Sequence, residues 1–201
     1  PGAVWTSDPY DVVIMESSHA WDTQFPTADP VTNRKSLISA CDQAIMDGAS
    51  RIIVVASALG EAQEAYITLC TAQMSGEFSG YTVRFAGKAG QVGNLYARLS
   101  NTPFSPWKNA VHLIANTDYV PENSIVIAGG YESGEGAGAK LTDTASMLSR
   151  TAVVKPAIGL TKSSVDYTYS ISLHASCGEL FATAAALNCR QVAFYHGQGT
   201  Q

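Results

Sequence analysis

Residues 51–57 read Arg-Ile-Ile-Val-Val-Ala-Ser, a short run rich in β-branched residues. A continuous apolar run of this length is typical of a strand covered on both faces, as in a parallel sheet. Residues 11–15 (Asp-Val-Val-Ile-Met) form a second such run. Between them, apolar residues recur at helical spacing over 37–45, and Gly48 stands where a left-handed C-terminal cap belongs. The three segments predict a βαβ unit whose two strands are adjacent, parallel and buried.

The rest of the chain continues this alternation of strands and helices. Helical spacing predicts further helices over residues 61–74, 92–99, 141–149 and 177–187. Apolar or alternating runs predict strands over residues 81–85, 124–128, 165–173 and 191–196, the first of them near a sheet edge. The pattern therefore predicts one α/β domain over residues 1–201, with a mainly parallel or mixed sheet and helices on both faces. A Gly-rich stretch at residues 129–139 is predicted to be an irregular surface loop.

Two of these elements show which side chains should be buried. In the strand over 165–173, Tyr167 and Tyr169 lie on the apolar side of a strict alternation. In the helix over 177–187, we expect Leu180, Phe181, Ala184 and Leu187 to face inward.

Composition excludes several classes of function. The chain has 46% apolar and only 14% charged residues, with a net charge of −5 and no run of Lys or Arg. Nucleic acid is not an expected partner, because binding it requires clustered cations. We expect no membrane insertion, since the apolar runs have the length of strands, and we find no secretory signal peptide. A surface with few charges suits a subunit packed among copies of itself.

The glycine loop and Cys177 allow two alternative functions. Gly134, Gly136 and Ala139 satisfy the G-x-G-x-x-A pattern of a dinucleotide site, but Glu132 and Glu135 would repel a pyrophosphate. We therefore prefer a surface flap over a nucleotide-binding domain, and expect no cofactor.

Cys177 stands between a strand and a helix, where a nucleophilic thiol is often displayed. His19 follows the first strand and His196 ends the last, so a cysteine-dependent hydrolase using Cys177 with either histidine is the main alternative. An ordinary buried thiol with two surface histidines explains the same residues, and we prefer that interpretation. Half a metal site at His174 and Cys177 has no matching second pair, so no metal is expected.

One segment resembles a known family. Residues 89–101 (AGQVGNLYARLSN), followed by residues 105–110 (SPWKNA), are similar to a segment of contractile phage tail-sheath proteins. There an apolar helix ending in Ala-Arg precedes Asp or Ser, a short gap and Trp. Ser100 replaces the commoner Asp, and Asn109 stands where the family often has Pro. The resemblance extends over residues 11–110, about half the chain.

The resemblance implies a structural subunit of a contractile tail or injection sheath, self-assembling and non-catalytic. Its partners would be copies of itself and an inner tube protein, and its location the virion or the host cytoplasm. Arg98 and Trp107 would serve packing or subunit contact. A whole sheath protein is longer and carries terminal arms, so this chain would be a core fragment.

Overall fold

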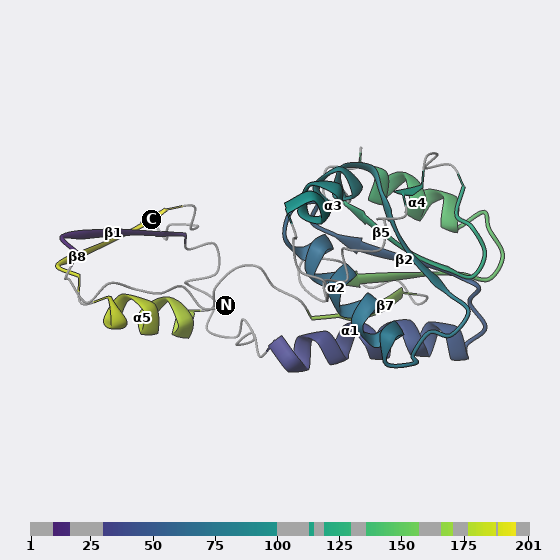
Figure 1. The fold of residues 1–201 in the computed structure, drawn as a ribbon, viewed down its shortest axis with the longest axis horizontal. Helices are drawn as coiled ribbons and strands as arrows, with labels where there is room; N and C mark the ends of the chain where they lie inside the picture. The colour runs from purple at the N-terminus through teal and green to yellow at the C-terminus, as the bar shows by residue number, and fades with distance from the viewer. Residues whose placement is uncertain are drawn as a thin grey trace. The chain divides into compact units, whose positions relative to one another are not determined.

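The computed structural model describes residues 10–16, 30–99, 113–114, 119–129, 136–156, 166–170, 177–187 and 189–195. Strands and helices alternate along most of these residues (Figure 1). In chain order the elements are β1 (Val12–Glu16), α1 (Pro30–Met46), β2 (Arg51–Ala56), α2 (Glu61–Met74), β3 (Thr82–Ala86), α3 (Gly87–Leu99), β4 (Leu113–Ile114), β5 (Ser124–Gly129), α4 (Ala137–Ala145), β6 (Thr151–Pro156), β7 (Asp166–Tyr169), α5 (Cys177–Ala186) and β8 (Gln191–Tyr195).

The chain divides into two units, and one is inserted into the other in sequence. Unit 2 is Pro30–Ile171, and unit 1 combines Pro1–Asp29 with Ser172–Gln201. Unit 2 holds a six-stranded sheet in the order β4-β3-β5-β2-β6-β7, and unit 1 holds the two-stranded sheet β1-β8. That residues 1–201 form a single domain stays a prediction.

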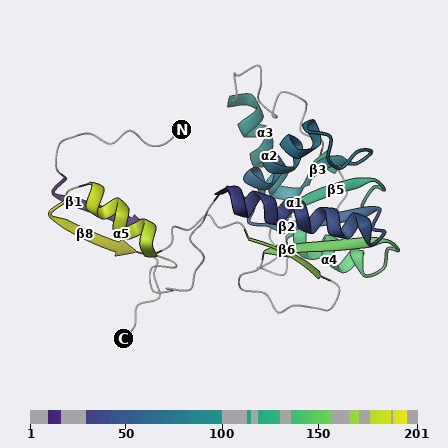
Figure 2. The same cartoon turned by 90° about the horizontal axis from the view of Figure 1, so that it is seen from below.

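The larger sheet is parallel throughout and has helices on both faces, as the sequence predicts. Alternate residues of the central strand β2 enter two separate cores. Ile52 and Val54 pack with residues of α1, α2 and α3 on one face, whereas Ile53 and Val55 pack with residues of α4 on the other. Both faces of β2 are therefore buried, which explains its unbroken apolar sequence. Figure 2 shows α1 running along one side of this sheet.

The expected pairing of the first two strands is wrong. β2 lies between β5 and β6, while β1 pairs with β8 in the smaller sheet, with Val12 opposite Gln191 and Ile14 opposite Ala193. The chain order strand, helix, strand suggested a local βαβ unit. The apolar run of β1 indicates a strand but carries no information on its partner, because pairing depends on contacts distant in sequence.

Several local expectations are confirmed and others need correction. The helix α2 has the predicted bounds, and Gly48 and Gly76, which follow α1 and α2, have φ angles of +94° and +96°. β3 lies one strand in from the two-residue edge strand β4. The sequence pattern does not predict β6, a short strand that ends in Lys155 and Pro156. Phe181 was expected to face inward and is 65% exposed, whereas Leu180 and Leu187 are buried.

The expected bounds of the surface loop at residues 129–139 are wrong at both ends. Gly129 ends β5 and is buried, and α4 already begins at Ala137, with Gly138 and Ala139 buried. A Cβ on Gly129 would lie 2.7 Å from the Cα of Ala58, so glycine is required where β5 approaches the loop after β2. Residues 130–135, with Glu132 and Glu135, lie outside the described residues.

Candidate functional site

Most of the sequence-predicted site residues lie outside the part of the chain whose side chains the structure describes. Cys177 is the first residue of α5, but its side chain is not among those described. His19, His196 and Trp107 lie outside the described residues. Arg98 lies in the last turn of α3 and is exposed. The hydrolase alternative and the contact roles of Arg98 and Trp107 therefore stay predictions.

The context of the glycine motif is partly as expected. The motif follows strand β5, and its last residue, Ala139, lies in the first turn of helix α4, so a strand precedes the motif and a helix follows it, as a dinucleotide site requires. Gly136 precedes the first residue of α4 with an extended backbone, and Gly134 lies outside the described residues. The nucleotide-binding alternative stays a prediction as well.

Polar side chains outside all the motifs discussed above meet at the carboxyl ends of β2 and β7. Ligands of open α/β sheets commonly bind at this edge. The Tyr169 hydroxyl lies 2.8 Å from Oε1 of Glu61 and 2.7 Å from the carbonyl oxygen of Val55. The second oxygen of Glu61 accepts a 2.8 Å hydrogen bond from the backbone N–H of Ser57. Tyr169 is 1% exposed and Glu61 7%, so this group is buried.

Gln63 extends the same cluster into the loop that connects β2 to α2. Its side-chain oxygen accepts a 2.6 Å hydrogen bond from the backbone N–H of Gly60, whose φ angle is +84°. Its amide nitrogen donates to the carbonyl oxygens of Ala58 and Ala89, both at 3.2 Å. Both carboxylate oxygens of Glu61, and both the oxygen and the nitrogen of the Gln63 amide, thus form hydrogen bonds within the protein. We interpret the cluster as a structural one, which holds the β2–α2 loop and β7 in place.

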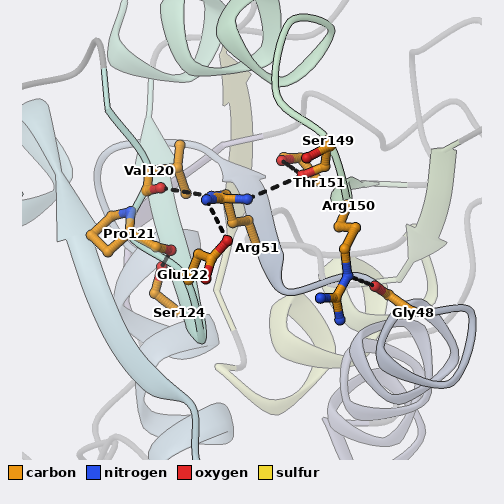
Figure 3. A network of polar contacts seen from close by, with 9 residues as sticks. All are labelled: Gly48, Arg51, Val120, Pro121, Glu122, Ser124, Ser149, Arg150 and Thr151. Atoms are coloured by element: carbon orange, nitrogen blue, oxygen red, sulfur yellow. Dashed lines mark hydrogen bonds and ion pairs between the residues drawn. The ribbon is translucent and has the colours of Figure 1, made fainter.

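A second polar network joins the loops at the amino ends of the strands, opposite the carboxyl ends just described (Figure 3). Arg51, the first residue of β2, donates from Nε to the carbonyl oxygen of Val120 at 3.0 Å and from Nη1 to that of Ser149 at 3.1 Å. Its Nη2 lies 2.8 Å from Oε1 of Glu122. Arg150 donates from Nε to the carbonyl oxygen of Gly48 at 2.9 Å. The network therefore connects the amino ends of β2, β5 and β6.

We expect Arg51 to contribute strongly to the stability of the protein through these contacts. Replacing Arg51 by Met should lower the free energy of unfolding by about 1–3 kcal/mol, since its two backbone acceptors lose a charged donor. The Arg51 side chain is only 12% exposed, whereas that of Glu122 is 62% exposed. The control Glu122→Gln should therefore change stability by less than about 1 kcal/mol. Urea unfolding of both variants tests this, and equal losses would assign the effect to the ion pair instead.

The thiols and carboxylates suggest no further centre. Cys41 is buried, and Cys70 and Cys189 are partly buried; none of the three forms a disulfide. Within the described ranges, no group of three His, Cys, Asp or Glu side chains is placed to hold a metal ion. No helix in that part of the chain is long and apolar enough to cross a lipid bilayer.

The smaller sheet exposes one largely apolar face. Val12 and Ile14 point to the same side of β1 and are 53% and 70% exposed. Their partners Gln191 and Ala193 on β8 are exposed as well. Val13, between the two, is partly buried. Figures 1 and 2 both show α5 running beside this strand pair.

Comparison with known proteins adds no relative: no protein-family model matches the chain, and a search of curated proteins gives no match.

Proposed function

We propose that this chain is a non-catalytic structural subunit that assembles with copies of itself, in a contractile tail or related injection sheath. The observation that carries the proposal is the exposed apolar face of the β1–β8 sheet. Parallel sheets in proteins are almost always covered on both faces. A parallel pair that leaves Ile14 70% exposed therefore requires a covering surface.

The edges of the same sheet support self-assembly in a second way. β1 and β8 each have one partner in the two-stranded sheet, so each strand has an outer edge without a paired strand among the described residues. Unpaired edges of this kind accept strands from other chains. The chain also has only 14% charged residues, which suits broad contacts between copies. In this proposal, strand addition and the Val12–Ile14 face together hold neighbouring subunits.

Assembly of the full natural chain that contains these residues tests the proposal. The wild-type chain should form rings or tubes in negative-stain micrographs. Ile14→Asp should abolish them, because burying an unpaired carboxylate in an apolar contact costs several kcal/mol. The melting temperature should remain nearly unchanged, since Ile14 is 70% exposed in the single chain.

A matched control separates this effect from a general loss of apolar surface. Met147 is 83% exposed and lies in unit 2, just after α4. Met147→Asp introduces the same charge in the unit that does not contain the Val12–Ile14 face, and should leave assembly intact. The proposal is wrong if Ile14→Asp assembles like the wild type, or if the full chain stays monomeric under all conditions. Turnover of a peptide or thioester that disappears in Cys177→Ala would favour the hydrolase.

A further inference from the structure

Strand β7 has an unusual position in unit 2. It is an edge strand of the six-stranded sheet and consists of four residues, Asp166–Tyr169. In the described part of the sheet it pairs with β6 alone, from Val153 opposite Asp166 to Pro156 opposite Tyr169. Two residues after Tyr169, at Ile171, unit 2 ends and the chain continues into unit 1. A short edge strand with a single partner is the part of a sheet that opens most easily.

Side-chain contacts at the carboxyl end of β7 oppose this opening. The buried hydroxyl of Tyr169 contacts both Val55 in β2 and Glu61 at the start of α2. The backbone N–H of Ser170 donates a 2.8 Å hydrogen bond to Oγ of Ser36 in α1. Ser36 in turn donates to the carbonyl oxygen of Asn33 at 2.7 Å. Three different elements therefore hold the last residues of β7.

The other end of β7 has a weaker attachment. The Tyr167 hydroxyl donates a 2.6 Å hydrogen bond to Oδ2 of Asp47, just after α1, and this contact is exposed.

Unlike β7, β6 has a second partner strand: it also pairs with β2, from Arg51 opposite Thr151 to Val54 opposite Val154. Removing β7 would thus leave β6 within a five-stranded sheet.

From these contacts we propose that β7 is a releasable edge strand, and that Tyr169 and Ser36 form the clamp that holds it. When the clamp is closed, β7 stays paired with β6 at the edge of the sheet. When it opens, β7 leaves β6 as one local unit while the sheet from β4 to β6 stays folded. This device goes beyond the proposed assembly function and does not depend on it.

Native-state hydrogen exchange of the full chain tests the clamp. Tyr169→Phe removes only the hydroxyl, and should speed exchange in β7 and in the β6 amides that pair with it by about tenfold, while β5 keeps its wild-type rate. Ser36→Ala should act in the same direction, and Ser36→Thr, which keeps the hydroxyl, should restore slow exchange.

Tyr81→Phe is a matched control. The Tyr81 hydroxyl also donates to a backbone carbonyl, that of Ala49 at 2.6 Å, and is distant from β7 in the chain. This variant should leave β7 exchange within about twofold of the wild type. The proposal is overturned if Tyr169→Phe speeds β5 and β7 equally, because β7 would then open only with the whole sheet. An unchanged rate in both Tyr169→Phe and Ser36→Ala would overturn it too.

Discussion

Replacing Phe85 by alanine should lower the free energy of unfolding by about 3–5 kcal/mol, one of the largest losses that a single substitution causes. Phe85 lies in β3 with no exposed surface, and its ring stacks on that of Tyr66 in α2 at a centroid distance of 4.6 Å. Truncation removes this contact and leaves a cavity between the sheet and its helices. Urea unfolding followed by far-UV circular dichroism measures the loss.

Two further variants make this prediction specific. Met74 ends α2 and is 77% exposed, so Met74→Ala should change stability by less than about 0.5 kcal/mol. The same ring also approaches α3, where a Cβ on Gly93 would lie 2.7 Å from a Phe85 ring carbon. Gly93→Ala should therefore be destabilising beside Phe85 and less so beside leucine at position 85. If the effects of Gly93→Ala and Phe85→Leu simply add, the Phe85 ring does not fill the space beside Gly93.

The elements of the fold were largely predictable because they depend on local sequence. α2 matches its predicted bounds, since its apolar spacing ends shortly before Gly76, which adopts the positive φ that glycine tolerates. β2 was recognisable from its β-branched run. β6 was missed because Lys155 and Pro156 interrupt a short apolar segment, although Lys155 is only 7% exposed. Local pattern does not reveal such tertiary burial.

The contacts that organise the structure were beyond the reach of local reasoning. Tyr169 was correctly placed on the buried side of its strand, and a buried tyrosine generally requires a partner for its hydroxyl. That partner, Glu61, is 108 positions away in sequence, and its own spacing indicated only a helix start. The β1–β8 pair is a second example, because its strands come from opposite ends of the chain. Topology, rather than propensity, decides both.

Raising the pH from 8 to 10 should lower the free energy of unfolding by about 2–3 kcal/mol, because a buried thiol, Cys41, and a partly buried one, Cys70, ionise more easily in the unfolded chain. Burial raises the pKa of the Cys70 thiol from 9.0 to about 11, partly offset by a hydrogen bond with Tyr66. Burial, reinforced by the nearby charge of Asp42, also raises the pKa of Cys41 well above its ordinary value.

The sign of the effect follows from proton binding. Between the unfolded and folded pKa values, the folded protein retains thiol protons that the unfolded chain has released, so folding weakens as the pH rises. The stability that the protonated thiols contribute is fully present below their pKa in the unfolded chain. It is lost as the pH rises through their pKa in the folded protein. Above pH 10 the buried phenols of Tyr66 and Tyr169 should steepen the fall, since burial raises the pKa of both above 10.0.

Urea titrations under reducing conditions at half-unit steps between pH 7 and pH 10.5 measure this slope. The double variant Cys41→Ala with Cys70→Ala should be less stable at pH 7, because it loses buried side-chain volume. Its stability should nevertheless change little from pH 8 to pH 10, since the ionising thiols are gone. A wild-type curve that is flat to pH 10, or a double variant that keeps the wild-type slope, would show that the two thiols do not control alkaline stability.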